Sequence, residues 1–163
     1  MQPASREVLS GTWDQTPPRR ALRRLGCPTV TPDANHQPGR DGLGDLIGLE
    51  YVEAGPEEVR ARVEVTDDVR QPAGLVHGGV FGVIAESVCS GATWLAVRDQ
   101  GMTAMGQSSS ATFLRPIAEG HVNIAARPRH RGRTTWVWDV EVTDDEGRLC
   151  ALVRMTVAVR ASP

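Results

Sequence analysis

The run from Gly79 to Val97 constrains the fold of this chain more than any other feature. Its residues are apolar or small on almost every side and include no proline, a pattern typical of a helix that is buried all round. A helix of about 18 residues is about 27 Å long. It must be wrapped by other elements or cross a membrane. Glu86 and Ser90 suit lipid poorly, so we expect a wrapped helix and no membrane association.

Segments in which apolar and polar residues alternate lie on both sides of this run. Residues 59–65 alternate valine or alanine with arginine or glutamate, the period-two pattern of a strand with one solvated face. Turn-forming residues separate the later segments. The expected order is two strands, the helix and four more strands. The other strands are predicted at residues 47–53, 102–114, 122–129, 134–142 and 148–160.

One antiparallel sheet curled around one buried helix satisfies this order, because the sheet offers one apolar face to cover the helix. The sequence therefore predicts an α+β protein with the hotdog fold. Such a sheet leaves open edges, so a symmetric dimer that extends the sheet is expected. Residues 1–42 are rich in proline and polar residues and are predicted to form a flexible arm, with a short helix near residues 19–25. Residues 43–163 are the predicted domain.

The charged and sulfur-containing residues exclude several classes of function. All 18 basic residues are arginines, which excludes chemistry that depends on lysine, such as Schiff-base formation. The net charge of -2 gives no reason to expect a nucleic-acid partner. Cys27, Cys89 and Cys150 lack the paired spacing of a metal site or a disulfide framework. We therefore expect no metal, reduced thiols and a cytoplasmic location.

Glu86 is the one carboxylate within the predicted helix. Burying an unpaired carboxylate would cost several kcal/mol. Its side chain therefore reaches solvent at a gap in the sheet, pairs with an arginine, or takes part in catalysis. The helix pattern alone leaves these alternatives open.

The turn that precedes the helix contains His77, Gly78 and Gly79. Two glycines at a helix start expose backbone N–H groups at the positive end of the helix dipole. A thioester carbonyl bound to the Gly78 N–H would be polarised for attack. Taken separately, the glycines could form only a tight turn and His77 only a structural cap. Together with Glu86 they supply the two parts that a thioester hydrolase needs, with Glu86 either attacking the carbonyl or activating water.

The segments Arg70-Gln71, Gly74–Gly79 and Ala85-Glu86 resemble the motif of hotdog acyl-CoA thioesterases. The likeness is greatest to the 4-hydroxybenzoyl-CoA and phenylacetic-acid-degradation branch, and it covers roughly residues 45–160. It implies a homotetramer built from dimers, with active sites at the dimer interface that combine residues of two subunits. It also implies an aromatic acyl-CoA as the substrate, and coenzyme A enters only as part of that substrate.

The resemblance also assigns roles to individual residues. Glu86 would be the nucleophile or the general base, and Gly78 the donor to the carbonyl. Gln71 and His77 would position the thioester. Ser90, which stands where that branch has threonine, would orient the attacking group through its hydroxyl. The expected contacts to substrate and coenzyme A are Gly79, Gln107, Ser108, Arg115, Arg133 and Thr134, the last three touching the nucleotide.

Two other functions are compatible with the same fold. An enoyl-CoA hydratase or dehydratase would use an acid–base pair such as His77 with Glu86, but the D-x-N-P-x-H loop of those enzymes is missing. A non-catalytic acyl-CoA-binding protein would bind the ligand without turnover. The leading hypothesis is hydrolysis of an aryl-CoA or related thioester to the free acid and coenzyme A.

Overall fold

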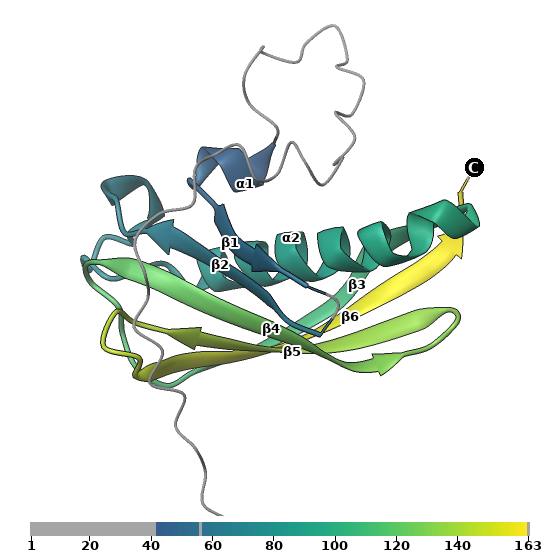
Figure 1. The fold of residues 1–163 in the computed structure, drawn as a ribbon. Helices are drawn as coiled ribbons and strands as arrows, with labels where there is room; N and C mark the ends of the chain where they lie inside the picture. Colours follow the sequence, from purple (N-terminus) through teal and green to yellow (C-terminus); the bar gives the residue numbers. More distant parts are fainter. Residues whose placement is uncertain (1–41, 56, 163) are drawn as a thin grey trace, which may run out of the picture.

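The computed structural model describes residues 42–55 and 57–162. A short helix and two strands precede the long helix α2, and four strands follow it (Figure 1). One short 3₁₀ helix lies on each side of α2. The bounds are α1 Leu43–Leu46, β1 Glu50–Ala54, β2 Val59–Glu64, 3₁₀ Asp67–Val69, α2 Gly78–Val97, 3₁₀ Arg98–Gln100, β3 Met102–Phe113, β4 His121–Arg131, β5 Thr135–Thr143 and β6 Leu149–Ala161.

All six of these strands form one antiparallel sheet in the order β1-β2-β4-β5-β6-β3. Helix α2 lies across one face of the sheet (Figure 1). The predicted α+β class and the hotdog arrangement are therefore confirmed. The long strand β3 is an edge of the sheet, so one side of its backbone has no neighbouring strand in the described part of the chain.

The predicted strand 47–53 begins three residues too early. Leu46 and Ile47 donate backbone hydrogen bonds to Gly42 and Leu43, and these bonds close the helical turn α1 before β1 begins. The other predicted strands agree with the observed ones to within about two residues at each end. The short helix predicted near residues 19–25, and all but the last residue of the predicted arm, lie outside the described residues.

Helix α2 is buried on one side rather than all round. Phe81, Ile84, Val88 and Cys89 have at most 5% of their surface exposed and pack against the sheet. By length and composition α2 could also cross a membrane, a test that the core helix of a soluble protein passes equally. The opposite side, which carries Glu86, is open in the single chain. The prediction of a helix wrapped on every side is therefore wrong for one chain alone.

A buried hydrogen-bond chain fastens α2 to the sheet. The indole Nε1 of Trp138 in β5 donates to Oγ1 of Thr93 at 3.0 Å, and Thr93 Oγ1 donates to the Cys89 carbonyl at 2.8 Å. Trp138 and Thr93 are both buried. Burial, and then the nearby charge of Glu86, raise the pKa of the Cys89 thiol far above its usual value. This cysteine is a small core residue rather than a nucleophile.

Candidate active site

The start of α2 leaves one backbone N–H group free. His77 is the N-cap residue, and its ring Nδ1 accepts a hydrogen bond from the Gly79 N–H at 3.0 Å. Val80 N donates to the His77 carbonyl at 2.9 Å. Among the described residues, the Gly78 N–H makes no backbone hydrogen bond. His77 therefore serves as the cap and engages Gly79, and Gly78 is the donor available to a ligand.

A tight turn brings Gln71 close to the start of α2. Gln71 N donates to the Leu75 carbonyl at 2.8 Å, and Gly74 N donates to the Gln71 carbonyl at 2.8 Å. Gly74 has a φ of 80°, a left-handed conformation that favours glycine. A hollow of about 400 Å³ opens between this turn, the start of α2 and the end of β3. Its lining residues are Gln71, Leu75, Val76, Gly78, Phe81, Phe113, Leu114, Arg115, Pro116 and Ile117.

Glu86 lies where α2 crosses the edge strand β3. A Cβ atom added to Gly106 would come within 2.9 Å of Glu86 Oε1, so glycine at that position makes room for the carboxylate. Ser90 Oγ donates to Glu86 Oε1 at 3.3 Å. The register of β3 against β6 shifts between Gly106 and Ser108, which leaves Gln107 as the extra residue of a bulge. The sequence-predicted residues Glu86 and Ser90 are thus brought together beside Gly106, which Gln107 and Ser108 follow in β3.

Glu86 is exposed, and no arginine of the described chain pairs with it. Of the two structural alternatives, the carboxylate therefore reaches solvent rather than forming an ion pair.

The two halves of the predicted site do not meet within one chain. Glu86 is eight positions after Gly78 on the same helix, a rise of about 12 Å. A carbonyl carbon under attack has to lie roughly 3–3.5 Å from the attacking atom while its oxygen accepts from the N–H donor. The resemblance to hotdog thioesterases allows for this separation, because it implies active sites that combine residues of two subunits.

The predicted nucleotide contacts are likewise far apart within a chain. Arg115 donates from Nη1 to the Leu149 carbonyl at 3.3 Å, at the beginning of β6. The Thr134 carbonyl accepts from Val159 N at 3.0 Å and from Arg160 Nη1 at 2.9 Å, near the end of β6. Ten strand residues span about 33 Å. Arg115 and the Arg133-Thr134 turn therefore lie at opposite ends of the sheet.

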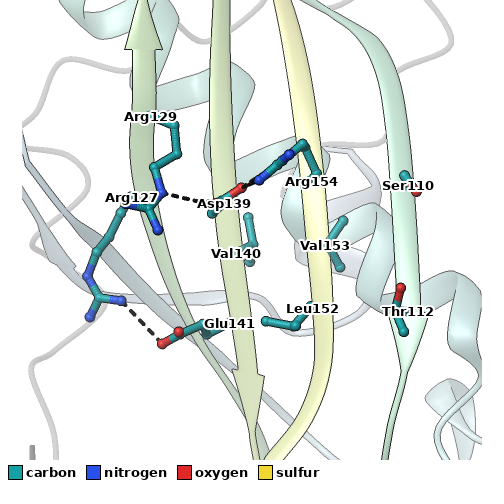
Figure 2. A pocket seen from close by; sticks show the side chains of 10 residues that line it. All are labelled: Ser110, Thr112, Arg127, Arg129, Asp139, Val140, Glu141, Leu152, Val153 and Arg154. Carbon is teal, nitrogen blue, oxygen red and sulfur yellow. Dashed lines mark hydrogen bonds and ion pairs between the residues drawn. The ribbon is translucent and has the colours of Figure 1, made fainter. Parts of the chain in front are cut away.

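Arg127 and Arg129, two of the arginines that precede Thr134 in the sequence, form ion pairs on the face of the sheet opposite α2. Figure 2 shows Arg129 of β4 and Arg154 of β6 converging on Asp139 of β5, at 2.7 and 2.9 Å. The hydrogen bond from Arg154, followed by that from Arg129, holds the pKa of Asp139 below its usual value despite partial burial. Arg127 bridges Glu58 and Glu141 on the same face. These arginines neutralise neighbouring carboxylates.

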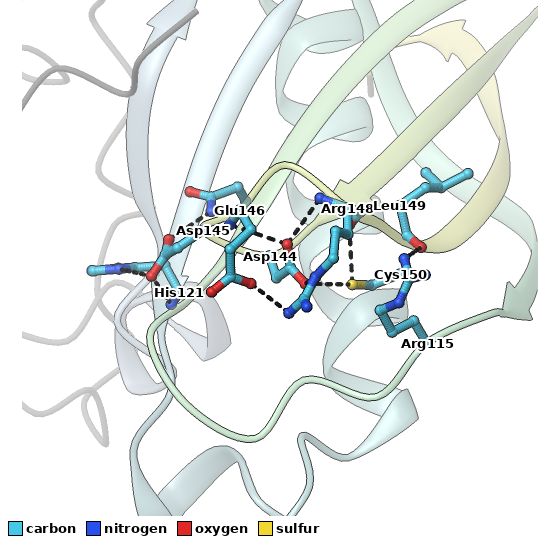
Figure 3. A network of polar contacts seen from close by, with 9 residues as sticks. Arg115, His121, Asp144, Asp145, Glu146, Arg148, Leu149 and Cys150 are labelled. Atoms are coloured by element: carbon cyan, nitrogen blue, oxygen red, sulfur yellow. Dashed lines mark hydrogen bonds and ion pairs between the residues drawn. The ribbon is translucent and has the colours of Figure 1, made fainter. Parts of the chain in front are cut away.

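A network of polar contacts joins the β5–β6 turn to the start of β4 (Figure 3). The sequence analysis did not predict this network. Asp144 is buried, with 5% of its surface exposed, and accepts from Arg148 N at 2.9 Å and from Arg148 Nε at 2.7 Å. Asp145 accepts from His121 N at 3.0 Å and from Asn123 Nδ2 at 2.9 Å. These contacts tie the β5–β6 turn to the start of β4, immediately after the loop that lines the hollow. The acidic residues at 144–146 fall between two predicted strands, and a single sequence does not show what they contact.

Burial alone would raise the pKa of the Asp144 and Asp145 carboxyl groups. Their hydrogen-bond partners lower the pKa by more than burial raises it. The Arg148 side chain and backbone lower the pKa of Asp144 below its usual value. Asn123 and His121 do the same for the pKa of Asp145. Both aspartates are therefore held ionised in the folded chain.

Comparison with known proteins identifies the family. Residues 73–151 match the family described as the thioesterase superfamily. The proofreading thioesterase EntH of Cronobacter turicensis is 34% identical over 117 residues, which cover 72% of this chain and 85% of that protein. The chain therefore belongs to the thioesterase superfamily, as its resemblance to the hotdog thioesterases predicted, and it is a thioester hydrolase.

Solved structures of thioesterases are similar to this chain in fold. A mutant of thioesterase PA1618 from Pseudomonas aeruginosa superposes with a TM-score of 0.71 at 32% identity, covering 91% of this chain and 98% of that one. Thioesterase HI1161 from Haemophilus influenzae gives a TM-score of 0.71 at 28% identity, covering 93% and 96%.

Proposed function

We propose that the protein hydrolyses an aryl-CoA or a related acyl-CoA thioester, releasing the free acid and coenzyme A. The observation that carries the proposal is the free Gly78 N–H at the start of α2, beside an apolar hollow and the Gln71 turn. A thioester carbonyl bound there meets a fixed donor and the positive end of a helix of 20 residues. The buried free thiols Cys89 and Cys150, together with a coenzyme A substrate, favour a cytoplasmic location.

The catalytic carboxylate comes from a second copy of the chain. The open edge of β3 can pair with its own counterpart about a twofold axis, which completes the sheet. When the two β3 strands, Met102–Phe113, overlap along their full length, the axis lies between Gln107 and Ser108, and Gly106 of the partner subunit lies opposite Ser109. Glu86 lies beside Gly106 in each chain. Glu86 of the partner subunit therefore approaches the Phe113 end of β3, where Gly78 lies.

The same pairing accounts for the separated nucleotide contacts. In an antiparallel pair, the Phe113 end of one β3 lies beside the Met102 end of the other. Met102 pairs with Ala161 in β6, close to the strand end that holds Thr134. Arg115 of one chain and the Arg133-Thr134 turn of its partner therefore share one end of the dimer. Arginine at both places suits the phosphates of coenzyme A.

The reaction uses these groups in a fixed order. The Gly78 N–H binds the carbonyl oxygen and stabilises the negative charge that develops on it. Gln71 lies beside the bound carbonyl, and Ser90 holds the Glu86 carboxylate through its hydroxyl. Glu86 either attacks the carbonyl carbon, giving a mixed anhydride that water then opens, or removes a proton from an attacking water. In both routes the C–S bond breaks, and the thiolate of coenzyme A leaves and takes up a proton.

The test is a kcat/KM profile of the purified protein across benzoyl-, 4-hydroxybenzoyl-, phenylacetyl- and straight-chain acyl-CoA. We expect hydrolysis with a preference for aromatic acyl groups. Glu86→Ala should lower kcat roughly 10²- to 10⁴-fold. The matched control is Glu64→Ala, which removes an exposed carboxylate of β2 and should leave kcat unchanged. No hydrolysis of any of these thioesters, or full activity in Glu86→Ala, would refute the proposal.

A further inference from the structure

The only two phenylalanines of the chain, Phe81 and Phe113, meet at the start of α2. Their ring centroids are 5.9 Å apart and the rings are tilted by 48°. Phe81 is buried, with 5% of its surface exposed, whereas Phe113 at the end of β3 is 59% exposed. A large aromatic ring is thus held in place by a buried one while most of its own surface faces outward.

The exposed ring lies directly against the proposed carbonyl donor. A Cβ atom added to Gly78 would lie 2.8 Å from Cζ of Phe113 and 3.2 Å from both of its Cε atoms. Leu114, the next residue, is 53% exposed and lines the same hollow. The wall nearest to the Gly78 N–H is therefore aromatic and apolar, and much of its surface is exposed.

We propose that Phe113 is a specificity-determining residue, because its exposed ring is the surface against which the acyl group of the thioester packs. The inference rests on the proposed function and deepens it. Aromatic rings attract each other in offset or tilted geometries beyond the area that they bury, so a flat aromatic acyl group gains more from this wall than a straight chain does. Phe81 sets the tilt of the Phe113 ring and so acts as a positioning residue.

The experiment compares the wild type with Phe113→Leu and Phe113→Ala, using benzoyl-CoA and hexanoyl-CoA. The measured quantity is the ratio of the two kcat/KM values. We expect Phe113→Ala to lower this ratio about three- to tenfold, mainly through the KM for benzoyl-CoA. Phe113→Leu keeps an apolar wall without a ring and should lower the ratio nearly as much. Because Phe113 is mostly exposed, both variants should keep the fold, which circular dichroism verifies.

The matched control is Leu152→Ala, which removes another exposed apolar side chain, on the outer face of the sheet (Figure 2). It should leave the ratio unchanged. An unchanged ratio in both Phe113 variants, or an equal loss for both substrates with a change of oligomeric state in size-exclusion chromatography, would overturn the role of Phe113 and leave the hydrolase proposal standing. A wild type that hydrolyses neither thioester would overturn both.

Discussion

The ring of His77 accepts a hydrogen bond from the N–H of Gly79, and this bond decides which N–H of the glycine pair stays available. Nδ1 accepts from Gly79 at 3.0 Å, so the donor left at the first position of α2 is Gly78. The sequence analysis gave a structural cap as one interpretation of His77. His77 is that cap, and by accepting from Gly79 it leaves the Gly78 N–H as the donor.

Gly78→Pro tests this assignment, because proline removes the N–H and is favoured at the first position of a helix. His77 has φ −66° and ψ 129°, an extended conformation that a following proline requires. We expect kcat to fall roughly 10²- to 10³-fold, the usual effect of losing an oxyanion donor. The control is Gly78→Ala, which introduces the same Cβ near Phe113 but keeps the donor. Equal kcat values for the two variants would show that the Gly78 N–H does not bind the carbonyl.

The contact between Gly106 and Glu86 gives a second prediction. In Gly106→Ala the new methyl group would meet Glu86 Oε1 at 2.9 Å and Met155 Cε at 2.8 Å, both of them ends of flexible side chains. The fold should therefore persist while the carboxylate moves, and we expect kcat to fall on the order of tenfold or more. Gly91→Ala, whose Cβ would make only an ordinary contact with Tyr51 at 3.6 Å, should keep its activity. Unchanged kcat together with an unchanged melting temperature in Gly106→Ala would count against the placement of Glu86.

The ion pair between the buried Asp144 and the exposed Arg148 predicts a loss of stability in acid. Because the pKa of Asp144 is lower in the folded chain than in the unfolded one, its contribution is complete above the unfolded pKa of about 3.9 and is lost as the pH falls through the folded pKa. Asp144→Asn should lower the free energy of unfolding by about 1–3 kcal/mol at pH 7. It should also flatten the fall in stability below pH 4, as measured by urea unfolding. A Glu146→Gln control, which changes an exposed partner of Arg148, should keep the wild-type pH dependence.

The fold was predictable because its periodicities are strong. The alternation along β2 is typical of a strand, and the long run of mostly apolar or small residues in α2 is typical of a buried helix. The order of these segments leaves few ways to cover the helix. Helix α1 was missed because it is only four residues long, and its signal is a single turn of hydrogen bonds.

The sequence predicts a set of site residues, which stays a prediction, but it does not give their arrangement in space. Ser90 lies one turn after Glu86, so their contact follows from the helix itself. The contact between Phe113 and Gly78 joins a strand end to a helix start 35 positions earlier, which a single sequence does not reveal. The Asp144 and Asp145 network depends in the same way on β4 and the β5–β6 turn coming together.

The central claim, that each active site combines Gly78 of one chain with Glu86 of another, is tested most directly by mixing two inactive chains. Gly78→Pro and Glu86→Ala chains with different tags are co-expressed, and the mixed oligomer is purified over both tags. A mixed dimer holds one intact composite site and one doubly defective site, so we predict recovery of up to about half of the wild-type activity. A mixed oligomer as inactive as its two parents would contradict the claim.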